Sequence, residues 1–77
     1  MITLIEAVKL CRIPEDESVY LRERGSDRFD YTLFTPREMR NRLDMRAIKV
    51  HAILVRFEAF GSDFLGMEFE VSGLMKR

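Results

Sequence analysis

The side chains that could support catalysis or metal binding are few in this 77-residue chain. Cys11 is the only cysteine and His51 the only histidine, so at most one thiol–imidazole pair is available for nucleophilic catalysis. Cys11 falls on the expected apolar side of a helix, where a thiol is usually an inert part of the core. One cysteine and one histidine also exclude an intramolecular disulfide and a Cys/His zinc site. We therefore expect neither a catalytic pair nor a structural metal.

Two other catalytic patterns are weak. Glu68 and Glu70 share one face of an expected strand and could act as a carboxylate pair. Arg56 is expected opposite them, which favours a solvated ion-pair cluster. The four glycines lie at positions 25, 61, 66 and 73, in expected turns or late in a strand, and do not form a phosphate-binding loop. The sequence thus predicts a protein that is not an enzyme and uses no cofactor.

Positive charge is concentrated in one segment, although the formal net charge of the chain is zero. Residues 35–49 have a net charge of +3, against −2 for residues 1–34 and −1 for residues 50–77. The basic side chains of this segment are Arg37, Arg40, Arg42, Arg46 and Lys49. They could contact nucleic-acid phosphates or an acidic partner. We favour the other interpretation, in which they form a solvated helix face that bridges to the acidic residues of the first segment.

One stretch of the basic segment is similar to a known DNA-binding motif. Thr35-Pro36-Arg37-Glu38-Met39-Arg40-Asn41-Arg42-Leu43-Asp44-Met45 resembles the first helix and turn of helix-turn-helix and winged-helix proteins. The resemblance covers about half of the chain. It implies a recognition helix over residues 46–60 and a wing over residues 64–71. A winged-helix-like fold that binds DNA through residues 37–49 is therefore the alternative prediction.

Two capping boxes predict where the helices begin. Thr3-Leu4-Ile5-Glu6 and Thr35-Pro36-Arg37-Glu38 each place a hydroxyl and a carboxylate three residues apart, and the second adds a proline at the first helical position. The first helix should end before Pro14, because proline disfavours helical geometry in the residue before it. In the second helix an apolar stripe is expected at Met39, Leu43 and Ala47.

A first hairpin is expected around Gly25-Ser26-Asp27, between residues 19–23 and 29–34. Phe29, Tyr31 and Leu33 alternate with polar residues, which predicts that they face the core. Pairing Leu21 with Tyr31 would place these apolar side chains on one face.

Residues 50–72 fit two structures. As a hairpin with the loop Gly61-Ser62-Asp63, Phe57 lies opposite Met67 and Ile53 opposite Val71. As a helix, residues 50, 53, 54, 57 and 60 fall on one side. The β-branched and aromatic content favours the hairpin.

The chain then consists of helix, hairpin, helix and hairpin. This αββαββ order predicts a single α+β domain over residues 1–77, a two-layer sandwich with a four-stranded antiparallel sheet and both helices on one face. The tripeptide Gly-Ser-Asp recurs 36 residues apart, which indicates either an internal duplication or the same turn chemistry used twice. The other face of the sheet would be open to solvent or to a partner.

This open face is the candidate interaction surface. Its expected members are Tyr20, Arg22, Leu54, Arg56, Phe60 and Phe64. Aromatic and arginine side chains are enriched at interfaces, and so short a chain has a thin core that a second chain would supplement. The predicted function is a small interaction module that binds a protein partner or itself. No apolar stretch approaches the length of a membrane helix, and a lone thiol fits the cytoplasm.

Overall fold

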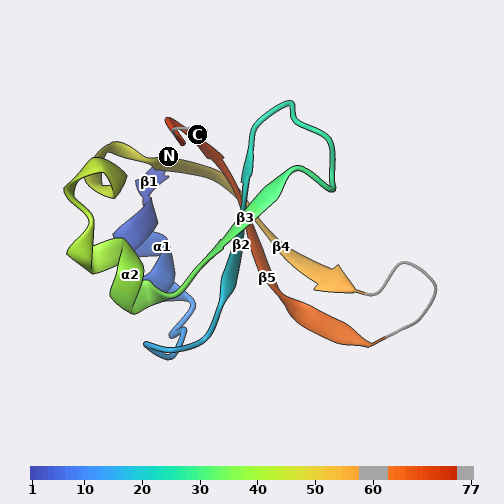
Figure 1. Ribbon diagram of the computed structural model, residues 1–77, viewed down its shortest axis with the longest axis horizontal. Helices are drawn as coiled ribbons and strands as arrows, with labels where there is room; N and C mark the ends of the chain where they lie inside the picture. Colours follow the sequence, from blue (N-terminus) through green and yellow to red (C-terminus); the bar gives the residue numbers. More distant parts are fainter. Residues whose placement is uncertain (58–62, 75–77) are drawn as a thin grey trace.

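In the part of the chain that the structure describes, five strands form one mixed sheet, and the helices pack against one of its faces (Figure 1). The computed structural model describes residues 1–57 and 63–74. The first half contains β1 (Ile2–Thr3), α1 (Leu4–Leu10), β2 (Val19–Glu23) and β3 (Tyr31–Phe34). The second half contains α2 (Pro36–Asn41), the 3₁₀ helix η1 (Leu43–Ala47), β4 (Lys49–Phe57) and β5 (Phe64–Ser72).

The two-layer α+β arrangement is confirmed, but the sheet differs from the expected one. It has five strands rather than four, in the order β1-β4-β5-β2-β3, and β5 runs parallel to β2. The extra strand arises because the N-cap Thr3 has extended backbone angles (φ −75°, ψ 162°), so that Ile2 and Thr3 can pair with the start of β4. The parallel pair arises because α2 and η1 carry the chain from β3, at one edge of the sheet, to the side of β1, at the other edge, before β4 begins. β5 then returns beside β2.

The recognition helix that the winged-helix resemblance predicted over residues 46–60 is not formed, so that prediction is wrong. Residues 49–57 form β4, which pairs antiparallel with β5 from Lys49↔Ser72 to Phe57↔Phe64. The β-branched and aromatic side chains that favoured the hairpin are the physical reason, because they suit a pleated surface better than a helix. The wing segment is β5, which lies inside the sheet between β4 and β2.

Both capping boxes are present. The Thr35 hydroxyl oxygen accepts a hydrogen bond from the Glu38 amide (3.2 Å), and the Glu38 carboxylate accepts one from the Thr35 amide (3.0 Å). The prediction of an apolar stripe at Met39, Leu43 and Ala47 is wrong: Met39 is buried, but Leu43 is 73% exposed. The cause is Arg42, whose extended angles (φ −111°, ψ 116°) end α2 and let η1 begin with a different face inward.

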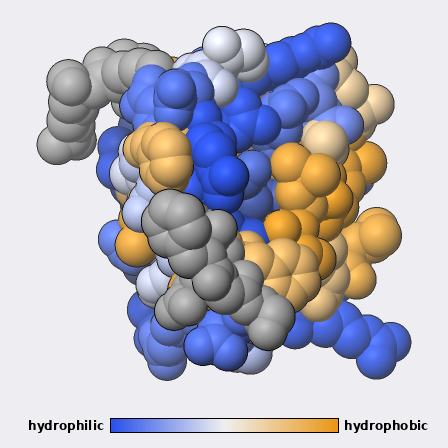
Figure 2. All heavy atoms as spheres, turned by 90° about the vertical axis from the view of Figure 1, so that its right-hand side faces the viewer, coloured by the Kyte–Doolittle hydropathy of each residue, from blue (hydrophilic) through white to orange (hydrophobic). Residues whose placement is uncertain are grey.

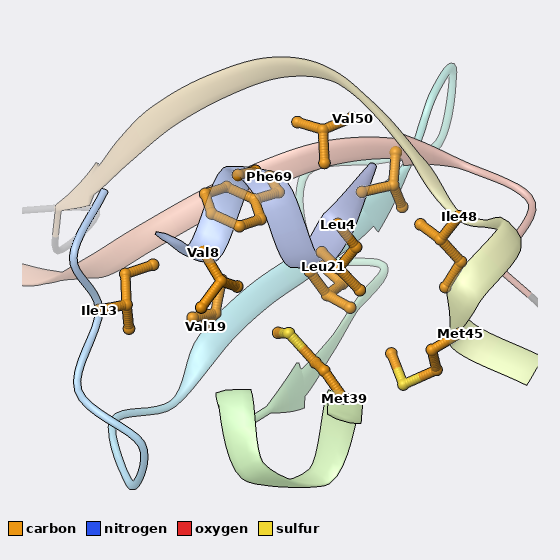
Figure 3. Packing of buried hydrophobic residues seen from close by; sticks show 12 residues of the cluster. Leu4, Val8, Ile13, Val19, Leu21, Met39, Met45, Ile48, Val50 and Phe69 are labelled. Carbon is orange, nitrogen blue, oxygen red and sulfur yellow. The ribbon is translucent and has the colours of Figure 1, made fainter. Parts of the chain in front are cut away.

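The core lies between the helices and the part of the sheet that they cover (Figure 3). The helical layer and the end of η1 contribute Leu4, Ala7, Val8, Met39, Met45 and Ile48. The sheet contributes Val19, Leu21, Val50, Phe69 and Val71. Leu21 and Phe69 pair across β2 and β5 and are fully buried, so they form the centre of this layer.

The β2–β3 pairing is shifted by one residue from the expected register. Arg22 lies opposite Tyr31, and Tyr20 lies opposite Leu33. A shift of one residue exchanges the two faces of a strand, so Tyr31 and Leu33 lie on the face away from the helices. The shift follows from the connection, which folds as two successive turns over residues 23–30 and leaves β3 to begin at Tyr31.

The hairpin of β4 and β5 is confirmed, with a register that differs by two residues. The sequence placed Phe57 opposite Met67, whereas the structure pairs Val55 with Met67 and Ile53 with Phe69. Over residues 52–56 this shift of two keeps each side chain on its expected face, whereas the irregularity between Arg56 and Phe57 places Phe64 opposite Phe57. Most of the expected loop, residues 61 and 62 included, lies outside the described residues.

The hairpin extends beyond the helices. A seven-residue and a six-residue helix are each about 10 Å long, whereas a nine-residue strand is about 30 Å long. The helical layer therefore covers only the Val50 end of β4. Ile53, Val55 and Phe57 follow on the same face without a helix above them and are exposed.

Candidate interaction surface

Four of the predicted surface residues share one face of the sheet. Tyr20 lies beside Glu68, as does Leu54 on the other side of β5, and the pairings of Arg22 and Arg56 keep the same alternation. This face is opposite the helices, as expected. Phe64 lies at the far end of the hairpin, and Phe60 lies outside the described residues.

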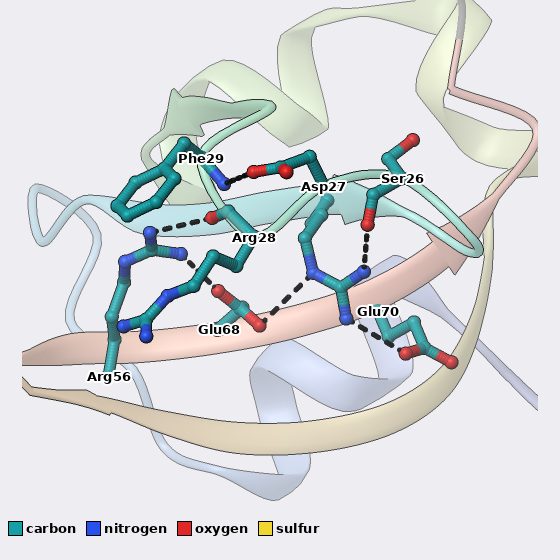
Figure 4. A network of polar contacts seen from close by, with 8 residues as sticks. Ser26, Asp27, Arg28, Phe29, Arg56, Glu68 and Glu70 are labelled. Carbon is teal, nitrogen blue, oxygen red and sulfur yellow. Dashed lines mark hydrogen bonds and ion pairs between the residues drawn. The ribbon is translucent and has the colours of Figure 1, made fainter.

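The centre of this face is covered rather than open. The Arg56 guanidinium group is ion-paired with the Glu68 carboxylate and donates a hydrogen bond of 2.7 Å to the Arg28 carbonyl oxygen (Figure 4). Its central carbon lies 5.1 Å from the ring centroid of Tyr20 and 4.4 Å from that of Tyr31. Arg56 is only 8% exposed as a result. It is a packed residue of the fold rather than a free contact group.

Arg22 makes a second set of contacts on the same face. It donates hydrogen bonds to Glu68 (3.4 Å), Glu70 (2.9 Å) and the Ser26 carbonyl oxygen (3.0 Å). The two arginines therefore hold the loop of residues 24–30 over the sheet by its main-chain carbonyls. The expected ion-pair cluster is present, but it is largely buried rather than solvated: the side chains of Arg22 and Glu68 are 12% and 10% exposed. Both glutamates serve as hydrogen-bond acceptors within the fold.

The thiol and the imidazole occupy different parts of the molecule. Cys11 is the C-cap of α1 and packs against the core. His51 lies on β4, with Nδ1 3.3 Å from an Arg24 guanidinium nitrogen and Nε2 2.9 Å from the Ser72 hydroxyl. Among the described residues, no three His, Cys, Asp or Glu side chains are grouped so that they could hold a metal ion. No helix of that part of the chain has the length and apolarity needed to cross a membrane.

The basic segment is divided among several elements. Arg37 and Arg40 on α2 form ion pairs with Asp16 (3.1 Å) and Glu15. These two bridges to the first segment match the interpretation that we favoured from the sequence. Arg46 lies on η1 and Lys49 on β4, so the five basic residues do not share one helix face.

Arg42 is held within its own turn. Its guanidinium pairs with Asp44 at 2.8 Å and lies over the Phe34 ring, 5.3 Å from the centroid. The hydrogen bond to Asp44 raises the pKa of Arg42 above its ordinary value. A guanidinium already paired in this way is less available to a phosphate.

A group of exposed apolar side chains lies at the far end of the β4–β5 hairpin. Five side chains with exposed fractions between 38% and 58% form it, and we call them the distal patch. They are Ile53, Val55, Phe57, Phe64 and Leu65. The rings of Phe57 and Phe64 meet edge to face, with centroids 6.3 Å apart. Figure 2 looks at this end of the molecule and shows most of the hydrophobic surface in that view gathered on one side.

The distal patch borders an open strand edge. β1 pairs with Lys49 and Val50 at the start of β4. Within residues 1–57 and 63–74, no strand lies beyond β4 along the rest of its length. The main chain from Ala52 to Phe57 therefore presents unpaired amides and carbonyls on that side.

Sequence reasoning found one member of the distal patch, Phe64, and assigned Ile53, Val55 and Phe57 to the core. Their alternation was interpreted correctly as a shared face, but the face continues past the helices. The signal that could have revealed this is length: a nine-residue strand cannot be covered by helices of six and seven residues.

Comparisons of this chain with protein-family models, curated proteins and solved structures gave no match.

Proposed function

We propose that this chain is a non-enzymatic protein-interaction module that binds through the distal patch and the open edge of β4. One observation carries the proposal. Five large apolar side chains, 38% to 58% exposed, lie together beside an unpaired strand edge. Exposed apolar surface of this extent marks interaction sites on soluble domains, and an open edge can accept a further strand.

The charged groups support this choice over nucleic acid. Arg37, Arg40 and Arg42 are already paired with carboxylates of the same chain. Phosphate binding would have to replace these pairs, and it would begin from a formal net charge of zero. The single free thiol, Cys11, supports a reducing compartment such as the cytoplasm as the place of action.

A display selection tests the proposal. The folded chain is presented to a library of short random peptides, and binding of the selected peptides is measured by calorimetry. We expect ligands that bind in extended form and lose affinity for Val55→Lys, which places a charge in the middle of the distal patch. Leu43→Lys is the matched control, because Leu43 is a well-exposed apolar residue on η1.

This function is contradicted if the selected peptides bind equally well to both variants, or if the folded chain enriches no peptide and also shows no self-association that depends on Val55. The urea midpoint of each variant is measured in parallel. Both substitutions replace an exposed side chain, so the free energy of unfolding of each monomeric variant should stay within about 0.5 kcal/mol of that of the wild-type monomer.

A further inference from the structure

We infer that the partner at the distal patch is a second copy of this chain, joined edge to edge through β4 about a two-fold axis. The inference rests on the proposed function and specifies its occupant. The two sheets would then be one continuous sheet across the dimer. A two-fold interface requires a surface that is complementary to itself, and β4 meets this requirement in its spacing, its charge and its area.

The spacing is set by the alternation of β4. Ile53, Val55 and Phe57 lie on one face of the strand. If two copies pair antiparallel with Val55 on the axis, Val55 lies opposite Val55 of the second copy, and Ile53 lies opposite Phe57 of the second copy. Cross-strand pairs of aromatic and β-branched side chains are favourable in antiparallel sheets. The open segment, Ala52 to Phe57, is centred close to this axis.

The charges also suit an antiparallel pair of identical strands. No member of the distal patch is ionisable, and the nearby Arg56 is neutralised by Glu68 within its own chain. Among the described residues, self-association therefore buries no unpaired charge. At the two ends of the hairpin, exposed Lys49 and exposed Asp63 carry opposite signs. Antiparallel pairing brings the Lys49 end of one copy toward the Asp63 end of the other, whereas parallel pairing would bring like charges together.

The area is sufficient for the apolar centre of a dimer interface. Five large side chains that are each about half exposed present roughly 400 to 500 Å² of apolar surface. A standard interface buries about 800 Å² on each partner, with an apolar centre and a polar rim. Main-chain contact along Ala52–Phe57 would bury part of the remaining area. A foreign partner would have to match this patch, whereas a second copy carries the matching surface already.

Light scattering and sedimentation equilibrium measure the mass of the chain in solution and so test the dimer. We expect the mass to rise from 9.1 kDa toward twice that value across the micromolar concentration range. We expect Val55→Lys to weaken the dimer by at least about 30-fold, the loss typical of a central interface residue. Leu43→Lys should leave the association unchanged. A wild-type chain that stays at 9.1 kDa throughout, or a dimer that Val55→Lys does not weaken, would overturn the inference.

Cross-linking locates the axis without introducing a charge. In a Cys11→Ser background, Val55→Cys should give a covalent dimer with a short bismaleimide, because the two thiols would lie on the axis. Leu43→Cys in the same background should give none. Equal cross-linking at the two positions would contradict the two-fold axis at Val55.

The inference and the proposed function can fail separately. A chain that remains monomeric but binds displayed peptides in a Val55-dependent manner contradicts self-pairing and retains the interaction module. A dimer that Val55→Lys does not weaken, together with a selection that yields no peptide, contradicts both.

Discussion

The guanidinium of Arg56 stacks on the ring of Tyr31, with its central carbon 4.4 Å from the ring centroid, although β5 and β2 lie between their strands. The residue directly opposite Arg56 on β5 is Gly66. Because Gly66 has no side chain, the Arg56 side chain can lie flat across β5 and reach Tyr31 on β3 along the same face of the sheet. This contact joins the interior of the β4–β5 hairpin to β3 and closes the face that the sequence led us to expect open.

Loss of the Arg56 side chain should be costly. Arg56→Ala removes the ion-pair partner of Glu68 and leaves that buried carboxylate with Arg22 alone. We expect the free energy of unfolding to fall by about 3 kcal/mol, as for other broken buried pairs. Urea denaturation followed by circular dichroism measures it. The double variant Arg56→Met with Glu68→Met should lose less than the sum of the two single variants; additive losses would show that the pair is not coupled.

The position of Gly66 should resist substitution more than that of Gly25. Both glycines have positive φ, 154° and 86°. A Cβ at Gly66 would lie 3.3 Å from Cε1 of Tyr20, whereas a Cβ at Gly25 meets no atom within 4 Å. We expect Gly25→Ala to cost about 1 kcal/mol from backbone strain alone and Gly66→Ala about 2 kcal/mol or more. Equal costs in urea denaturation would show that the Tyr20 contact has no effect.

The first capping box should make stability depend on pH. The amide and the hydroxyl of Thr3 donate hydrogen bonds to the Glu6 carboxylate, and the amide contributes most to lowering the pKa of Glu6. The unfolded chain therefore takes up this proton more readily than the folded chain. The contribution is present above the ordinary glutamate pKa of about 4.3 and is lost as pH falls through the lower folded value.

We therefore expect the urea midpoint of wild type to fall more than that of Glu6→Gln between about pH 7 and pH 3. Glu17→Gln is the control for the loss of one negative charge at an exposed position. Parallel curves for wild type and Glu6→Gln would contradict a stabilising role for the ionised Glu6.

The 3₁₀ helix η1 should be anchored by Met45 and not by Leu43. Met45 is buried among the core residues, whereas Leu43 is exposed. We expect Met45→Ala to lower the free energy of unfolding by about 2 to 4 kcal/mol, through lost burial and the cavity left behind. Leu43→Ala should change it by less than about 0.5 kcal/mol. A larger loss for Leu43→Ala than for Met45→Ala in thermal or urea denaturation would contradict the anchoring of η1 by Met45.

Local chemistry could be predicted from the sequence because neighbouring residues determine it. The capping boxes at Thr3 and Thr35 require only a hydroxyl and a glutamate three residues apart. The alternation of β4 and β5 depends on the two-residue period of a strand, so the expected faces of residues 53–56 were correct even though the register was not. For the same reason, Tyr20, Arg22, Leu54 and Arg56 were assigned to one face without knowledge of their neighbours.

Only the tertiary structure decided the strand order, the register of β2 and β3, and which parts of each face are covered. These depend on residues far apart in the chain. Arg56 is buried because the loop of residues 24–30 folds over it, and Val55 is exposed because the helices end before they reach it. Hydrophobic periodicity shows which side of a strand an apolar residue occupies. Whether that side meets a helix, a loop or water is determined by the lengths and positions of the elements packed there, and this is why the candidate surface lies on the opposite face from the one expected.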